Sequence, residues 1–162
     1  MKLIIFGLPG TGKTSIGKYI SKKFRFKFIE GDDFLIDEIK QAIKHDRIIT
    51  DAMRDKYYTI LLRKLKSAKD KDTVIVDAIP KDKYRRKFLA LPNAKLMYVY
   101  VNKEVLKDRL KRRKGHIIEQ KYLKKILTYF EYPKINCIKI NNTLDENSTR
   151  KRVDSIIHLI YK

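Results

Sequence analysis

The chain of 162 residues has one cysteine, no tryptophan, four prolines and six glycines. With Cys137 alone, an internal disulfide framework and a cysteine-built zinc site are excluded, and a reducing compartment is expected. Acidic residues are also scarce, because 19 Asp and Glu stand against 39 Lys and Arg, a formal charge of +20. No run approaches the roughly 20 consecutive apolar residues of a membrane helix. We therefore expect a soluble, cytoplasmic protein with no membrane partner.

Hydrophobic residues make up 43% of the chain, including ten Tyr and seven Phe, which is enough for one compact core. Apolar runs of strand length occur at 3–6, 27–30, 73–77, 95–101 and 136–140. Segments with helical spacing lie between and after them, at 14–24, 33–44, 51–66, 81–89, 103–113, 119–130 and 148–161. This alternation predicts a single α/β domain over 1–162, with a parallel sheet of about five strands flanked by helices.

A phosphate-binding pattern of glycines, a lysine and a hydroxyl residue follows the first expected strand and precedes the first expected helix. Glycines allow successive backbone N–H groups to turn toward phosphate oxygens, and the N-terminal end of the helix favours an anion. Lys13 is expected to reach the β- and γ-phosphates, and Thr14 to bind Mg²⁺. The predicted ATP-binding residues are Gly7, Leu8, Pro9, Gly10, Thr11, Gly12, Lys13, Thr14 and Ser15.

This P-loop, or Walker A, pattern serves GTPases, mechanical ATPases and small kinases alike. The segment 102–105 begins like a guanine-reading motif, but Val105 stands where a carboxylate is needed, which disfavours a GTPase. A chain of this size without partner domains also disfavours a mechanical ATPase. The pattern therefore favours a compact kinase that transfers the γ-phosphoryl group of Mg-ATP to a hydroxyl.

Such a kinase needs a carboxylate that accepts or orients the substrate hydroxyl proton. Asp32 follows the second expected strand, at the edge where α/β sheets bind ligands, and is the predicted catalytic carboxylate. The alternative is that Asp32 or Asp33 caps the next helix. Asp77 ends the third strand and is predicted to hold Mg²⁺ through water, with a turn residue as the alternative. The predicted metal site is thus Thr14, Asp32 and Asp77.

A strongly basic segment at 107–114 is followed by Gly115 and His116, a break that suits a hinge. It predicts a helical lid over about 107–125, whereas the alternative is a solvated basic helix face. Arg109 is assigned to ATP, and Arg113 to the charge that develops on the transferred group. His116 is assigned to the substrate, with an ordinary surface histidine as the alternative.

The chain resembles the P-loop small-molecule kinases, and most closely the gluconate kinase family. The resemblance rests on elements in the family's order: the P-loop, Gly31-Asp32, Asp51 with Arg54, Lys81 with Tyr84-Arg85, and Arg113 to His116. It implies a three-layer P-loop NTPase fold, a homodimer, and Asp32 as base. It also implies Arg54, Lys81, Tyr84 and Arg85 around a sugar acid. The chain departs from the family at Leu35-Ile36, at Lys56-Tyr57 and at Ile126, all on the substrate side.

A second resemblance is to polynucleotide 5′-hydroxyl kinases, carried by Asp32-Asp33, Val76-Asp77-Ala78 and Phe130 to Pro133. The charge of +20 suits a phosphate-backbone partner, because affinity for nucleic acid is largely electrostatic. A sugar acid such as gluconate is the leading predicted acceptor, and a nucleic acid or nucleotide is the alternative. The alternative from another class is a basic nucleic-acid-binding protein whose ATP site is regulatory.

Overall fold

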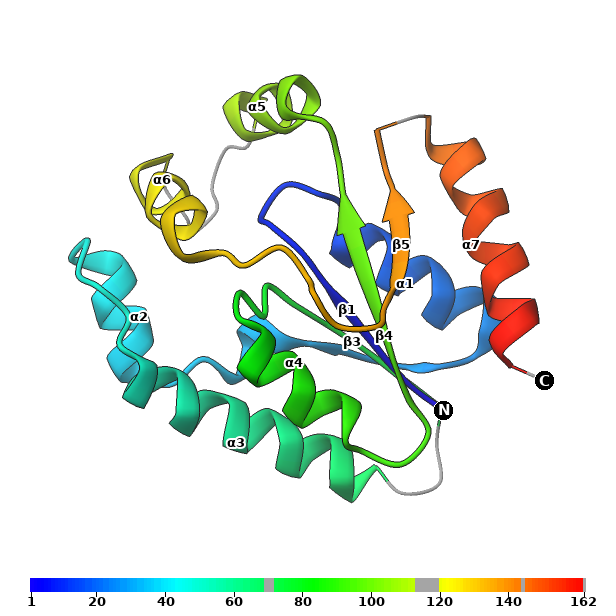
Figure 1. Ribbon diagram of the computed structural model, residues 1–162, viewed down its shortest axis with the longest axis horizontal. Helices are drawn as coiled ribbons and strands as arrows, with labels where there is room; N and C mark the ends of the chain where they lie inside the picture. Colours follow the sequence, from blue (N-terminus) through cyan, green and yellow to red (C-terminus); the bar gives the residue numbers. More distant parts are fainter. Residues whose placement is uncertain (69–71, 113–119, 144, 162) are drawn as a thin grey trace.

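The computed structural model describes residues 1–68, 72–112, 120–143 and 145–161, with the backbone alone at 120–124. Strands and helices alternate along the described chain (Figure 1). The strands are β1 Lys2–Phe6, β2 Lys27–Glu30, β3 Thr73–Asp77, β4 Ala94–Tyr100 and β5 Ile138–Asn141. The helices are α1 Lys13–Phe24, the 3-10 helix η1 Gly31–Phe34, α2 Asp37–Lys44, α3 Asp51–Ser67, α4 Asp82–Leu89, α5 Lys103–Arg112, α6 Gln120–Tyr129 and α7 Glu146–Ile160.

The sheet is parallel throughout, with the strand order β2-β3-β1-β4-β5. Alternate residues of β1 face opposite layers, as the period of two in a strand requires. Leu3 and Ile5 pack with α1 and α7, whereas Ile4 and Phe6 pack with α2, α3 and α4. Figure 1 shows these helices on the two sides of the sheet, which completes the predicted three-layer fold.

Three elements differ from the expectation by more than one residue at a boundary. The segment expected as one helix at 33–44 divides into η1 and α2, because Leu35 and Ile36 adopt extended backbone between them. The last helix starts earlier than expected, because Asp145 accepts a hydrogen bond from the Ser148 N–H at 2.9 Å and caps it. The last strand lies at 138–141 rather than 136–140, where its residues pair with Met97–Tyr100 of β4.

The carboxyl ends of the strands gather the loops that carry the predicted chemistry. The phosphate loop follows β1, η1 follows β2, Asp77 ends β3, and α5 follows β4. Open α/β sheets bind their ligands along this edge. None of the described helices is both long and apolar enough to cross a membrane.

Candidate active site

The phosphate loop curls between β1 and α1 and is fastened by its own side chains. Thr11 Oγ1 donates to the Leu8 carbonyl at 2.9 Å, and Lys13 Nζ donates to the same carbonyl at 2.9 Å. Gly12 has φ 90°, and a Cβ there would lie 2.3 Å from Nδ2 of Asn142. Both the backbone conformation and the neighbouring side chain therefore require glycine at position 12, directly before α1.

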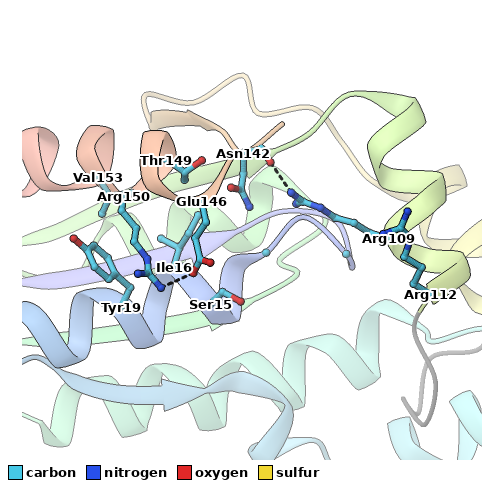
Figure 2. Close-up of a pocket in the computed structure, with 12 residues that line it drawn as sticks. Ser15, Ile16, Tyr19, Arg109, Arg112, Asn142, Glu146, Thr149, Arg150 and Val153 are labelled. Carbon is cyan, nitrogen blue, oxygen red and sulfur yellow. Dashed lines mark hydrogen bonds and ion pairs between the residues drawn. The ribbon is translucent and has the colours of Figure 1, made fainter. Parts of the chain in front are cut away.

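Two side chains from other elements hold this loop from outside. Arg109 of α5 donates to the Asn142 carbonyl at 2.9 Å (Figure 2). Asn142 Nδ2 in turn donates to the Thr11 carbonyl at 2.8 Å. The structure thus places Arg109 beside the P-loop residues with which it was predicted to act. Asn142 was missed by sequence reasoning, although a polar residue after the last strand is the signal that could have found it.

A cavity of about 510 Å³ opens beside the loop. Figure 2 shows it between α1, α5 and α7, with side chains of all three helices converging on it. Ser15 and Tyr19 come from α1, and Arg109 and Arg112 from α5. Arg150 of α7 pairs with Glu146 and stacks over the Tyr19 ring at 5.0 Å. The cavity has the position and size for the base and ribose of a nucleotide whose phosphates lie on the loop.

Three carboxylates lie at the carboxyl ends of β2 and β3, on the edge of the sheet that carries the loop: Glu30 ends β2, Asp32 follows it in η1, and Asp77 ends β3. Asp77 is buried and accepts hydrogen bonds from the Tyr57 hydroxyl, from the Tyr58 hydroxyl at 3.2 Å and from the Ile79 N–H at 2.9 Å. Burial, together with the charge of Asp32, raises the pKa of Asp77 to about 6. Neither tyrosine was predicted, because only the packing of α3 against β3 brings them to this carboxylate.

Glu30 lies beside Thr14, whose Oγ1 donates to a Glu30 oxygen at 3.5 Å. Burial raises the pKa of Glu30, and the charge of Asp32 raises it further. The Thr14 hydroxyl and the carboxylates of Glu30 and Asp77 offer oxygen ligands, which a hard cation such as Mg²⁺ prefers. Burial makes these carboxylates costly to ionise, and a bound cation would offset that cost. In the described part of the chain no three His, Cys, Asp or Glu side chains could hold a metal ion alone.

A second, smaller pocket of about 90 Å³ lies on the other side of the loop, with Pro9 in its wall. Its charged residues are Asp32, Arg54 and Asp77. Asp32 is exposed, and α2 begins at Asp37 behind Ile36, so neither Asp32 nor Asp33 occupies its N-cap position. The Arg54 guanidinium is buried and stacks on the Tyr129 ring at 4.4 Å.

Three further residues predicted to surround the substrate, Lys81, Tyr84 and Arg85, do not line this pocket. Lys81 pairs with Asp51 at 2.8 Å, and Tyr84 is buried with its hydroxyl 3.3 Å from the Asp51 carbonyl. Arg85 is fully buried, donates to Asp82 at 2.6 Å and to the carbonyls of Ile79 and Pro80, and stacks between Phe6 and Phe130. Arg113 and His116 lie outside the described residues, as does the part of the predicted lid at 113–119.

Comparison with known proteins places the chain by its sequence. A family model described as an AAA domain matches residues 3–129. The chain belongs to this AAA domain family. Among curated proteins, the Pentafunctional AROM polypeptide of Schizosaccharomyces pombe (strain 972 / ATCC 24843) is 38% identical over 61 residues, which is 36% of this chain. The match spans only 4% of the length of that relative.

Two solved structures have a similar fold over nearly the whole length of this chain. A sugar kinase from Janibacter sp. HTCC2649 has a TM-score of 0.86 at 22% identity, covering 97% of this chain and 94% of that one. A gluconokinase from Sinorhizobium meliloti 1021 has a TM-score of 0.80 at 20% identity, covering 99% and 95%. The predicted P-loop fold and its resemblance to the gluconate kinase fold are therefore confirmed.

Proposed function

We propose that the protein is a kinase that transfers the γ-phosphoryl group of Mg-ATP to a hydroxyl of a small molecule. The main support for this proposal is that two cavities lie on the two sides of one phosphate loop. Gly10 and Gly12 line the large cavity, and Pro9 lines the small one. A nucleotide in the first and an acceptor in the second would meet over the loop, which is the arrangement that phosphoryl transfer needs.

In this proposal each residue acts through its charge or its proton. The acceptor oxygen attacks the γ-phosphorus, the bond to the β,γ-bridging oxygen breaks, and Asp32 accepts or orients the hydroxyl proton. Lys13 and Arg109 oppose the negative charge that spreads over the phosphates. Thr14 would hold Mg²⁺, with Glu30 and Asp77 beside it, and the bound ion would neutralise charge on the β- and γ-phosphates.

The proposed acceptor is inferred from similar folds and from the charge of the chain. The resemblance to gluconate kinases, together with the sugar kinase and gluconokinase among similar folds, supports a sugar acid such as gluconate. The second candidate is a nucleic acid or nucleotide, which the net charge of +20 favours. The same charge supports the alternative of a nucleic-acid-binding protein with a regulatory ATP site.

The test is Mg-ATP consumption by the purified protein with gluconate, shikimate, nucleoside monophosphates and 5′-hydroxyl RNA or DNA, with products identified by mass. We expect one small acceptor to gain a phosphoryl group, and Lys13→Ala to lose the activity while keeping the fold. Unchanged turnover by Lys13→Ala would remove the P-loop from the mechanism. ATP binding without phosphorylation of any acceptor would favour the regulatory alternative.

A further inference from the structure

The small pocket beside Asp32 is walled mainly by hydrocarbon. Its apolar wall consists of Leu35, Ile39, Ile43, Ile49, Pro80 and Ile126. Ile39 and Ile43 lie in α2, and Ile126 lies in α6. The other three come from connecting segments, after η1, between α2 and α3, and before α4, so several separate parts of the chain build the wall. Lys125 of α6 pairs with Asp46 after α2 at 2.8 Å and joins two of these walls.

The polar side chains that line this pocket belong to three charged residues and three tyrosines: Asp32, Arg54, Asp77, Tyr57, Tyr58 and Tyr129. The hydroxyls of Tyr57 and Tyr58, which also line it, donate to Asp77. The remaining charged groups are Asp32, at the phosphate loop, and Arg54. Asp32 can therefore pair with an acceptor hydroxyl and Arg54 with one further polar group, whereas most of the remaining wall is isoleucine, leucine and proline.

The carboxylate that pairs with Arg54 is shared with two lysines that lie outside the pocket. Arg54, Lys81 and Lys83 all pair with the single carboxylate of Asp51, at 3.2, 2.8 and 2.9 Å. Three cations against one anion favour a second anion nearby. The stack of the Arg54 guanidinium on Tyr129 holds it in a fixed orientation for such a group.

We infer that the acceptor is a small hydroxy acid with an apolar body, which places its hydroxyl at Asp32, its hydrocarbon against the isoleucine wall and its anionic group at Arg54. This inference rests on the proposed kinase function and narrows its acceptor. A polyhydroxylated acid would bury hydroxyls without partners in the same space, which is unfavourable. Three of the positions that depart from the gluconate kinase pattern, Leu35, Tyr57 and Ile126, line this one pocket.

The experiment compares acids that differ only in their hydroxyl groups. Gluconate and 6-hydroxyhexanoate share a six-carbon chain with a carboxylate and a terminal hydroxyl, and quinate and 4-hydroxycyclohexanecarboxylate form a cyclic pair. With wild-type protein and Mg-ATP, we expect kcat/KM to be at least about tenfold higher for the apolar member of one pair, the effect of one unpaired buried hydroxyl. The neutral 1,6-hexanediol is expected to be a poorer acceptor than 6-hydroxyhexanoate, because it offers Arg54 no charge.

A matched pair of variants on α6 tests the wall itself. Ile126 is 3% exposed and lines the pocket, whereas Leu127, the next residue, is 54% exposed. Ile126→Gln is expected to shift the kcat/KM ratio toward the polyhydroxylated acid by about tenfold. Leu127→Gln, the control, is expected to leave that ratio unchanged. An Ile126→Gln ratio equal to that of Leu127→Gln would overturn the role of the wall.

The outcomes separate this inference from the proposed function. Preference for gluconate and quinate, or no product from any of the four acids while Mg-ATP still binds, would overturn the inference and leave the kinase proposal standing. Absence of Mg-ATP binding, measured by calorimetry on wild-type protein, would overturn the proposed function instead. A preference for the apolar acids supports both.

Discussion

Asp32 is the most exposed of the three carboxylates near the phosphate loop. It is exposed at the small pocket, whereas Glu30 is half-buried beside Thr14 and Asp77 is buried among hydrogen-bond donors. An exposed carboxylate next to the phosphate loop can take a proton from an acceptor and release it to water, which a buried one cannot do readily.

We therefore expect Asp32→Asn to bind Mg-ATP nearly as well as the wild type and to lose about 10²-fold or more in kcat, the usual range for acid–base catalysis. Calorimetry measures the binding, and product formation measures the rate. Asp33→Asn is the matched control, since Asp33 does not line the pocket. Equal losses in the two variants would reduce Asp32 to a charge of this loop rather than a catalytic group.

Arg85 shows how a residue chosen for substrate binding can instead belong to the interior. Its guanidinium is 0% exposed, bonded to Asp82 and two carbonyls, and enclosed by two aromatic rings. We expect Arg85→Met to lower the free energy of unfolding by about 3 kcal/mol, because it leaves two carbonyls and a carboxylate without their donor. Denaturant unfolding measures this. A raised KM for the acceptor with unchanged stability would contradict the structural role.

Between elements, Asp51 at the start of α3 links that helix to the turn that begins α4. Hydrogen bonds from Lys81 and Lys83 hold the pKa of Asp51 well below its usual range. Because the native pKa is lowered, these ion pairs contribute fully above about pH 4 and are lost as the pH falls toward the native pKa.

The expected result is a free energy of unfolding that decreases as the pH falls below about 4, with a shallower decrease in Asp51→Asn. Denaturant unfolding at several pH values gives both slopes. The double variant Lys81→Met, Lys83→Met should flatten the same slope, because it removes the donors rather than the carboxylate. If all three proteins lose stability in parallel, this pairing does not link the helices.

Elements with a local signal were the ones that sequence reasoning could predict. The buried parallel strands form nearly continuous apolar runs, and the phosphate loop has its spacing within eight residues. The break at Leu35 and Ile36 was missed, because these apolar residues also fit a helical period. Tyr57 and Tyr58 were not predicted as site residues, because they reach Asp77 only when α3 packs against β3. The pairing of Lys81 with Asp51 depends in the same way on the packing of α3 near α4.

At the scale of the whole molecule, the charge of +20 and the small pocket point to different ligands. A field of this size attracts any polyanion, and such binding weakens steeply with salt because counterions are released. The pocket at Asp32 has a volume of about 90 Å³ against about 510 Å³ for the large cavity, which is little room for a nucleotide as acceptor. Binding of a polyanion and phosphoryl transfer to it therefore need separate measurements.

We expect a labelled 5′-hydroxyl oligonucleotide to bind at low salt and to lose most of its affinity between about 50 and 200 mM salt, the range over which phosphate contacts weaken. Fluorescence anisotropy measures this binding, and mass spectrometry of the same oligonucleotide after incubation with Mg-ATP detects any added phosphoryl group. No addition is expected, because the strand end would have to enter a pocket walled by isoleucine side chains. A phosphorylated 5′ end would show that the basic surface guides the acceptor itself, and the oligonucleotide would then replace the hydroxy acid as the substrate.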